Sequence, residues 1–333
     1  MKRTNTISTF ARIACVLSVA LLPLMTGCKK DNDEIVDYSS TFEASGERGV
    51  GALPGVFSVA EGRAVCFSKG NLQFFVREGT HTTADGETMD GTWRFADEQY
   101  FYQGYGNVSG DTSCSDHTDL FGWGTSGWQS GANAVSPCEL SVVSTDYTPG
   151  NNARANLTGG YVNADWGQYN AIDNGGDAPG LWRVLSRNEW SYIFHQRTNT
   201  RLNNIPNARF AKAQVNGING MLIFPDKYQH PTRVALPEDI NVMDATFSNN
   251  HYDGADWDSL EVAGVVFLPA AGMRYGTDIM RMHTCGQYWS STSNGALDAY
   301  FVSFLSGAYD PTTFGYRCNG RSVRLVQDVK VEE

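Results

Sequence analysis

Apolar and polar residues alternate along several stretches of the chain, and this alternation predicts strands. "VFSVAEGRAVCFSKGNLQFFV" (56–76) alternates around turn residues, as a pair of strands does. Near the end of the chain, "AYFVSFL" (299–305) places Tyr300, Val302 and Phe304 on one face of a strand. That face is apolar throughout, so we expect it to lie against the core and the mixed opposite face to be exposed. A strand covered on both faces is the alternative, which alternation alone does not exclude.

One segment, "SRNEWSYIFHQR", has the spacing of a helix. Ser186 and Glu189 are placed as in a capping box, whose two side chains satisfy free backbone amides of the first turn. An apolar stripe follows at helical spacing and is expected to be buried: Trp190, Ile193 and Phe194. Two later runs, "GMLIFPD" and "GVVFLPAAG", are short, apolar and interrupted by proline, so they predict buried strands.

The chain divides into an N-terminal targeting signal, a tether and one long domain. Residues 28–52 are polar and contain glycine, which predicts a flexible tether. From Gly104 to Pro179 the chain is irregular and rich in Gly, Asn, Ser and Asp, which is typical of functional or cross-braced loops. No repeat or clear boundary divides residues 53–330, so we expect a single domain there.

The first residues have the features of an export signal. Basic residues precede the apolar run "IACVLSVALLPLM", which is too short to span a bilayer and is typical of a signal peptide over residues 1–27. The ending "LMTGC" resembles a bacterial lipoprotein box, which implies lipidation at Cys28. Ordinary cleavage beside an incidental cysteine is the alternative. "KKDNDE" then resembles the export tag of Bacteroidetes surface lipoproteins, and together these imply an outer-membrane lipoprotein exposed on the cell surface.

Charge restricts the expected partners of the protein, and cysteine content restricts its possible disulfides. The formal net charge is −11 and no Lys/Arg cluster interrupts it, so nucleic acid is not an expected partner. Apart from Cys15 and Cys28 the chain has five cysteines, and an odd number in an exported chain leaves at least one thiol unpaired. Cys114 and Cys138 are able to close a loop, although sequence does not fix the pairing.

Motifs for catalysis or metal binding are weak. "GWGTSG" matches the dinucleotide pattern G-x-G-x-x-G, but no helix is predicted after it, so we interpret it as a turn. Cys114 and His117 have C-x-x-H spacing, and His283 with Cys285 offers a second pair, yet a core thiol beside a surface imidazole is the favoured interpretation. No nucleophile motif or acid pair stands out, so we expect no catalytic site, metal or cofactor. A structural Ca²⁺ stays open at three acids without calcium-loop register: Asp253, Asp256 and Asp258.

The composition of residues 290–326 is unusual. These 37 positions contain no Lys, Glu, Gln, Trp or Met, whereas the whole chain has 46 of these among 333 residues. About five would be expected from composition alone. The five missing types are the ones that codons ending in a pyrimidine, of the form N-N-pyrimidine, do not encode. This segment also carries bulky and reactive side chains at positions where polar loop residues are usual.

Motifs in series carry a resemblance to a known group of proteins. "GLWRVLSRNEWSYIF" resembles a segment of the formylglycine-generating-enzyme-like branch of the C-type lectin fold. The order "FSKGNLQF", "WRFADEQY", "DLFGWGTSGW", "GMLIFPD", "GQYWSST" and "GRSVRLV" resembles Bacteroidetes lipoproteins related to the Fibrobacter major paralogous domain. The resemblance covers about residues 55–328. It implies an α+β fold of the C-type-lectin and formylglycine-generating-enzyme-like type, rich in loops, with short strands and few helices.

Members of this group include target proteins of diversity-generating retroelements, in which an error-prone reverse transcriptase randomises adenines in Asn-type codons of a C-terminal segment. The resemblance implies a fixed framework of "YWSST", Ala299, Tyr300, Phe304, Pro311, Arg317 and "GRSVRLV", stapled by Trp182, Trp190 and Trp289. It also implies variable, ligand-binding positions: Asn294, Leu297, Asp298, Phe301, Ser303, Leu305, Asp310, Thr312, Thr313, Phe314, Tyr316, Cys318 and Asn319.

The implied function is ligand binding on the cell surface. Phe301, Phe314 and Tyr316 would serve as aromatic anchors, with polar neighbours such as Asp298 and Asp310 supplying hydrogen bonds. The partner would be a protein or glycan on another cell, a phage or a host. A carbohydrate-binding or pilus-tip subunit that is not diversified is the alternative. An oxidase of the formylglycine-generating type fits less well, because the C-terminal region offers Cys318 without a nearby second cysteine.

Overall fold

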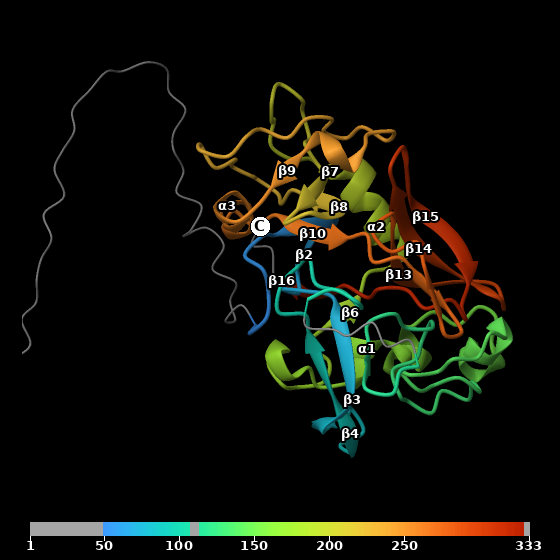
Figure 1. Ribbon diagram of the computed structural model, residues 1–333. Coiled ribbons are helices and arrows are strands. Elements are labelled where there is room, and N and C mark those ends of the chain that lie inside the picture. Colours follow the sequence, from blue (N-terminus) through green and yellow to red (C-terminus); the bar gives the residue numbers. More distant parts are fainter. Residues whose placement is uncertain (1–48, 107–112, 330–333) are drawn as a thin grey trace, which may run out of the picture. The chain divides into compact units, whose positions relative to one another are not determined.

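The computed structural model describes residues 49–106 and 113–329. The expected signal peptide (1–27), Cys28 and most of the expected tether therefore lie outside the described residues. In the described part, the chain forms many short strands and few helices, joined by long loops (Figure 1). The expected α+β class with short strands and few helices is confirmed at this coarse level.

A four-stranded antiparallel sheet joins the beginning of the described chain to its end. Its strand order is β1-β2-β16-β6, with bounds β1 (Phe57–Ala60), β2 (Arg63–Phe67), β6 (Arg183–Val184) and β16 (Leu325–Val329). Val326 of β16 pairs with Phe67 on one side and with Arg183 on the other. The predicted strand pair is confirmed as β1 and β2, and the last strand lies between elements that are far apart in sequence.

A second four-stranded sheet supplies much of the apolar interior. Its order is β10-β8-β7-β9, with bounds β7 (Phe210–Val215), β8 (Ile218–Ile223), β9 (His251–Tyr252) and β10 (Val266–Pro269). The two apolar runs predicted to be buried strands are confirmed as β8 and β10, which pair with each other. Pro269 has no N–H to donate, and it ends β10 at the edge of this sheet.

The remaining strands of the described residues form three smaller sheets. The first has the order β4-β3-β5, with bounds β3 (Leu72–Thr82), β4 (Thr88–Phe95) and β5 (His117–Thr118). The second is the hairpin of β11 (Met273–Tyr275) and β12 (Asp278–Met280). The third follows sequence order: β13 (Cys285–Asn294), β14 (Asp298–Leu305) and β15 (Ala308–Tyr316). In Figure 1 this last sheet is the red one and carries most of the candidate positions.

Helices are short and begin at side-chain caps or tight turns. The predicted capping box is confirmed at α2 (Arg187–Ser191): the Glu189 N–H donates to Ser186 Oγ over 3.3 Å, and the Ser186 N–H donates to the Glu189 carboxylate over 2.8 Å. A π-helical turn, η5 (Tyr192–Gln196), continues it. The others are α1 (Trp166–Tyr169), α3 (Ala255–Val262) and the 3₁₀ turns η1 (Ser144–Tyr147), η2 (Pro149–Asn151), η3 (Gly159–Ala164), η4 (Asp173–Gly175) and η6 (Phe247–Asn249).

Buried apolar side chains form three main clusters between these elements. One cluster joins the first two sheets to α2 and includes Phe67 and Trp190. Another joins the β3–β4 hairpin to the β13–β14 hairpin and includes Trp182 and Trp289. Trp182, Trp190 and Trp289 are each 0% exposed, so their predicted place in the core is confirmed.

The irregular middle of the chain is cross-linked. Cys114 and Cys138 form a disulfide, which confirms the pairing that the sequence left open. His117 is only 2% exposed, because β5 packs it against β3, with its ring 5.6 Å from that of Phe75. The predicted core thiol beside a surface imidazole is therefore wrong for Cys114 and His117, since the sulfur is in a disulfide and the imidazole is buried. It is confirmed for the second pair, in which Cys285 is a buried free thiol and His283 is exposed.

Candidate ligand-binding surface

An exposed aromatic group lies on the sheet of β13, β14 and β15. The antiparallel register places Tyr300 opposite Phe314 and Asp298 opposite Tyr316, so these side chains share one face. The rings of Tyr300 and Phe314 meet edge to face with centroids 5.9 Å apart. Phe314 is 56% exposed and Tyr316 is 55% exposed. We call Tyr300, Phe314 and Tyr316 the aromatic patch.

The predicted faces of β14 are wrong for the first half of the strand. Tyr300, expected in the core, is only half-buried and belongs to the aromatic patch. Phe301, expected as an exposed anchor, is 6% exposed and its ring lies 5.7 Å from that of Trp289. In the second half, Val302 and Phe304 are buried on the opposite face, as predicted.

The faces of β14 differ from the prediction because the sheet lies between two clusters of the core. Ala299 and Phe301 pack into the cluster that contains Trp289, whereas Val302 and Phe304 pack into the cluster that contains Trp190. The pairing of β14 with β15 also shifts register between Phe301 and Ser303. Each face of the strand is therefore covered along a different half, and a simple alternation of buried and exposed positions does not hold.

Most of the candidate positions are nevertheless accessible. Four are exposed: Leu297, Asp310, Phe314 and Tyr316. Seven are half-buried: Asn294, Asp298, Ser303, Leu305, Thr312, Thr313 and Asn319. Expected framework positions between them are buried, namely Ala299, Phe304, Pro311 and Arg317.

Phe301 and Cys318 were predicted to be exposed ligand-binding positions, and this prediction is wrong, because both side chains are buried. Cys318 is 2% exposed and packs with Ala134 and Tyr147. Burial raises the pKa of the Cys318 thiol, so the reactive thiolate is disfavoured at neutral pH. Phe301 is buried against Trp289 and the Arg321 guanidinium, whereas Cys318 follows β15 and is covered by Ala134 and Tyr147.

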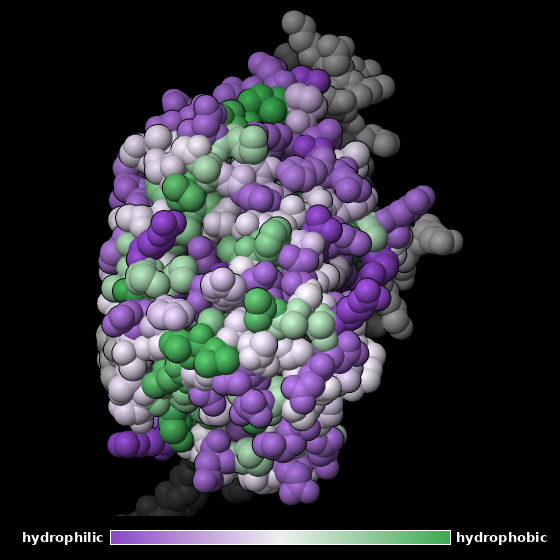
Figure 2. All heavy atoms as spheres, turned by 90° about the vertical axis from the view of Figure 1, so that its right-hand side faces the viewer, coloured by the Kyte–Doolittle hydropathy of each residue, from purple (hydrophilic) through white to green (hydrophobic). Residues whose placement is uncertain are grey.

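The accessible positions form two groups on opposite faces of the sheet. Asp298, Phe314 and Tyr316 share the face of the aromatic patch. Ser303 and Asp310 pair with each other on the other face, near the turn that joins β14 to β15. On the side of the molecule shown in Figure 2, hydrophobic residues form several groups among polar ones. The aromatic patch is the stronger candidate for one continuous contact, because the rings of Tyr300 and Phe314 touch and both Phe314 and Tyr316 are more than half exposed.

Arg187 completes the aromatic patch, although sequence analysis did not identify it. Its guanidinium carbon lies 4.4 Å from the centre of the Tyr300 ring, within the range of a cation–π contact. Its backbone N–H donates to Thr292 Oγ1 over 3.0 Å, which fixes the start of α2 against β13. The contact joins two residues that are far apart in the chain, so no local pattern in the sequence was able to indicate it.

Two buried arginines hold the candidate segment through its backbone. Arg317 donates to the carbonyl oxygens of Gly295 and Asp298 over 2.6 and 3.0 Å. Arg321 donates to Gln287 Oε1 over 2.8 Å and to the Tyr316 carbonyl over 3.0 Å. Burial lowers the pKa of Arg317 to about 10 and that of Arg321 to about 9, so both stay cationic at neutral pH. Because carbonyls accept these bonds, the backbone is fixed without help from the outward side chains.

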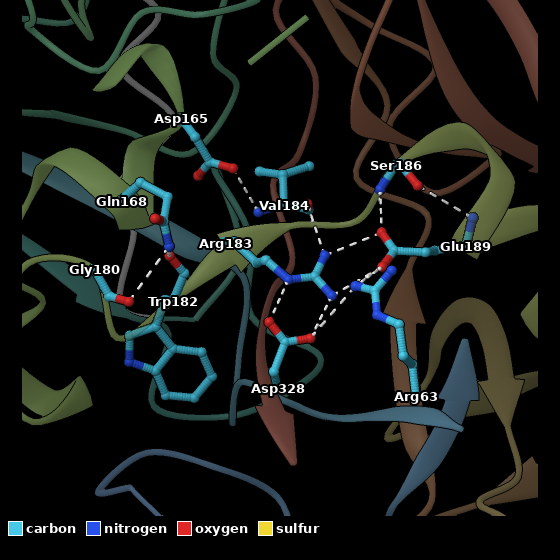
Figure 3. Close-up of polar contacts among 10 residues, drawn as sticks. All are labelled: Arg63, Asp165, Gln168, Gly180, Trp182, Arg183, Val184, Ser186, Glu189 and Asp328. Atoms are coloured by element: carbon cyan, nitrogen blue, oxygen red, sulfur yellow. Dashed lines mark hydrogen bonds and ion pairs between the residues drawn. The ribbon is translucent and has the colours of Figure 1, made fainter. Parts of the chain in front are cut away.

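A cavity of about 280 Å³ lies beside β13, lined by Ser291 and by residues from β2, β6 and the start of α2, among others. Figure 3 shows Arg183 between two carboxylates, 2.9 Å from Glu189 and 2.7 Å from Asp328. Arg63 also pairs with Glu189, over 2.9 Å. The charges at this cavity are thus paired with one another, and the network ties β2, β6, β16 and α2 together.

Asp165 lies in the same cavity and has an unusual pKa. Burial raises the pKa of its carboxyl to about 7, although the Val184 N–H donates to it over 2.8 Å (Figure 3) and the Gly167 N–H over 3.1 Å. These bonds cap α1 and position β6. Both carboxyl oxygens are therefore engaged in structural bonds, which favours a structural role over acid–base chemistry.

The described ranges contain neither a metal cluster nor a membrane span. Among residues 49–106 and 113–329, no three His, Cys, Asp or Glu side chains lie close enough to hold a metal ion. Within the same ranges, no helix is both long and apolar enough to cross a membrane. The geometry offers an aromatic, partly polar contact surface on a rigid sheet. No protein-family model, curated protein or solved structure matches this chain.

Proposed function

We propose that this protein is a ligand-binding lipoprotein, anchored through Cys28 in the outer membrane and displayed on the cell surface. Its segment 290–326 forms a diversified binding surface, as a target of a diversity-generating retroelement, on a fold of the C-type-lectin and formylglycine-generating-enzyme-like type. The partner is a protein or glycan on another cell, a phage or a host. One observation carries this proposal: between Asn294 and Asn319, eleven of the thirteen candidate positions are accessible, whereas Ala299, Phe304, Pro311 and Arg317 of the expected framework are buried.

The outward side chains of this sheet are free to change without loss of the fold. Arg317 and Arg321 bond backbone carbonyls of the segment, and these bonds do not depend on which side chain points outward. Aromatic residues on such a support give a large contact area at a small entropic penalty, and small polar residues adapt their hydrogen bonds. This is the division of roles that a variable binding surface needs.

The genetic test is to sequence the neighbourhood of the gene and many sibling copies of it. We expect a reverse transcriptase gene, an adenine-rich near-copy of codons 290–326, and variation confined to the candidate positions, with Ala299, Pro311 and Arg317 constant. If siblings instead vary evenly along the domain and no template copy exists, the segment is a fixed loop and the proposal is wrong.

The protein-level test compares exposed with buried aromatic residues. Replacing both Phe314 and Tyr316 by alanine is expected to lower the free energy of unfolding by only about 1 kcal/mol, because surface changes are small. Replacing buried Phe301 by alanine, the matched control, is expected to lower it by about 3–5 kcal/mol. Urea denaturation measures both. Loss of cooperative unfolding in the double variant would show that these rings belong to the core and not to a contact surface.

A further inference from the structure

β15 is an outer strand of its sheet (Figure 1), and among the described residues no other strand pairs with its free edge. The second half of this strand, "TTFGY" (312–316), carries no charge, and Thr, Phe and Tyr favour strands. Proteins usually protect such an edge with charges, prolines or a covering loop, because its backbone groups are able to pair with another chain. An uncharged free edge is therefore a candidate site for pairing.

The register of β14 and β15 shows which backbone groups of β15 face outward. The Arg317 N–H donates to the Leu297 carbonyl oxygen over 2.9 Å, and the pairs that follow along the two strands keep the same register. Opposed residues of an antiparallel pair alternate between hydrogen-bonded and non-bonded pairs. Gly315 therefore bonds β14, whereas Phe314 and Tyr316 direct their N–H and C=O groups away from it.

An independent contact on the other side of β14 agrees with this alternation. Tyr300 lies opposite Phe314, and its carbonyl oxygen accepts from Ser290 Oγ of β13 over 2.8 Å. The Tyr300 carbonyl thus points away from β15, as expected for a residue of a non-bonded pair. The backbone groups of Phe314 accordingly point away from β14, toward the free edge.

This edge is closed at both ends and open between them. Pro311 has no N–H, and the Thr312 N–H donates to Asp310 Oδ1 over 2.8 Å. At the other end, the Tyr316 carbonyl oxygen accepts from a buried arginine over 3.0 Å. Three outward backbone groups have no hydrogen-bond partner among residues 49–106 and 113–329, namely the N–H and C=O of Phe314 and the N–H of Tyr316.

These three groups match an extended polypeptide. They lie along one strand edge at a spacing of two residues, and an extended backbone presents complementary C=O and N–H groups with the same repeat. The rings of Phe314 and Tyr316 stand beside them, so they would contact alternate side chains of an added strand. Strand addition uses main-chain bonds for affinity and side-chain contacts for specificity.

Charge favours a basic segment of another protein over a second copy of this chain. In segment 290–326 the accessible charged side chains are those of Asp298 and Asp310, and both are acidic. Two copies of this chain would each bring a net charge of −11, which opposes their association. A segment that contains Lys or Arg is instead attracted to this edge.

We propose that the partner binds as an added strand: an extended, basic segment of another protein pairs its backbone with Phe314 and Tyr316 at the edge of β15. This inference rests on the proposed function, because it uses the same surface, and it names the partner class as a polypeptide. The backbone bonds are the same whichever side chains occupy positions 314 and 316. The mode of pairing is therefore kept while the sequence preference of the surface varies.

The first test is amide hydrogen exchange of the full chain, followed by NMR without any ligand. The amides of Thr313 and Gly315 bond β14, whereas those of Phe314 and Tyr316 face solvent. We expect the second pair to exchange faster than the first by about tenfold or more. Equal protection of all four amides would show that the edge is already covered, and it would overturn the proposal.

The second test selects binders to the full chain from a library of random decapeptides. Selected peptides are expected to be rich in Lys and Arg and to slow the exchange of the Phe314 and Tyr316 amides. Phe314→Pro removes an outward N–H and should weaken peptide binding by about tenfold or more relative to Phe314→Ala. Phe314→Ala is the matched control, because it loses the same ring and keeps the N–H. Thermal melting verifies that both variants are folded.

A measurement on the unchanged protein makes the test independent of folding. Methylating single backbone nitrogens of a selected peptide should abolish binding at alternate positions, where the N–H or the space beside it is used, and have little effect between them. The proposal is overturned if methylation has the same effect at every position, or if no decapeptide binds. It is also overturned if bound peptides leave the exchange of Phe314 and Tyr316 unchanged, as a contact with the face of the sheet would.

Two further outcomes separate this inference from its alternatives. Protection of Phe314 and Tyr316 that rises with protein concentration, without peptide, would identify a second copy as the occupant and overturn the proposal. Sibling genes that vary at the candidate positions would still support a diversified surface if strand addition fails. Conversely, evenly varying siblings would reject diversification even if peptides pair with β15.

Discussion

At the scale of single residues, buried carboxyl groups set the response of the protein to pH. Burial raises the pKa of Asp119 and of Asp165 to about 7, from a usual value of 3.8. Asp119 Oδ2 accepts from the Gln103 N–H over 2.7 Å, while Oδ1 has no hydrogen-bond partner among the described residues. A carboxylate with one free oxygen in the interior is unfavourable, so the folded state favours the protonated acid.

The first prediction concerns the stability of Asp119→Asn. Between about pH 4 and pH 7 the unfolded chain releases the Asp119 proton while the folded protein keeps it, so stability falls as pH rises through this range. From about pH 5 to pH 7.5 this group should remove about 2 kcal/mol. The asparagine side chain introduced by this substitution stays neutral and keeps an oxygen for the Gln103 N–H, so the variant should lose about that much less. Urea denaturation at both pH values measures the difference.

The control is Asp278→Asn, at an exposed position of β12. This variant should show the same pH dependence as the parent. If Asp119→Asn also follows the parent, then Asp119 is ionised in the folded state and its missing partner is water.

At the scale of elements, caps and apolar runs were predictable because their causes are local. The capping box of α2 needs two side chains three positions apart, and β8 and β10 need short runs of apolar residues. The faces of β14 were not predictable, because two clusters from distant parts of the chain cover different halves of the strand. Arg187 was missed for the same reason, since its contact with Tyr300 depends on how α2 packs against the sheet.

The prediction at this scale concerns the loop between Cys114 and Cys138. The disulfide joins residues separated by 24 positions, which reduces the conformational freedom of the unfolded chain. Replacing both cysteines by serine is expected to lower the free energy of unfolding by about 3 kcal/mol. Denaturant unfolding measures the change, and the parent under reducing conditions should match the variant. Equal stability with and without the disulfide would mean that the loop is held by its other contacts.

At the scale of the whole molecule, the last strand completes the first sheet. β16 lies between β2 and β6, which both come much earlier in the chain, and its Asp328 pairs with Arg183. Such long-range pairings are slow to form, because long loops must close before they bring any stabilising contact. The protein therefore depends on its final residues for the order of strands near its beginning.

A truncation tests this dependence. A chain that ends at Arg324 lacks β16, exposes the unpaired edges of β2 and β6, and is expected to lose cooperative unfolding by circular dichroism. A chain that ends at Val329 retains the strand and serves as the control. Cooperative melting of the shorter chain at an unchanged temperature would show that β16 is dispensable.

The sequence by itself determined the sheet-rich class, the cap of α2, the apolar strands and the buried tryptophans. Each of these follows from short-range spacing or from the strong tendency of large apolar side chains to be buried. Only the tertiary structure decided which side of β14 is covered at each residue, that Phe301 and Cys318 face inward, and that Arg187 lies on Tyr300. It also decided which buried polar atoms lack a hydrogen-bond partner within residues 49–106 and 113–329, as at Trp93 Nε1 and Asn170 Oδ1. These features depend on contacts between residues far apart in sequence, and no local pattern contains that information.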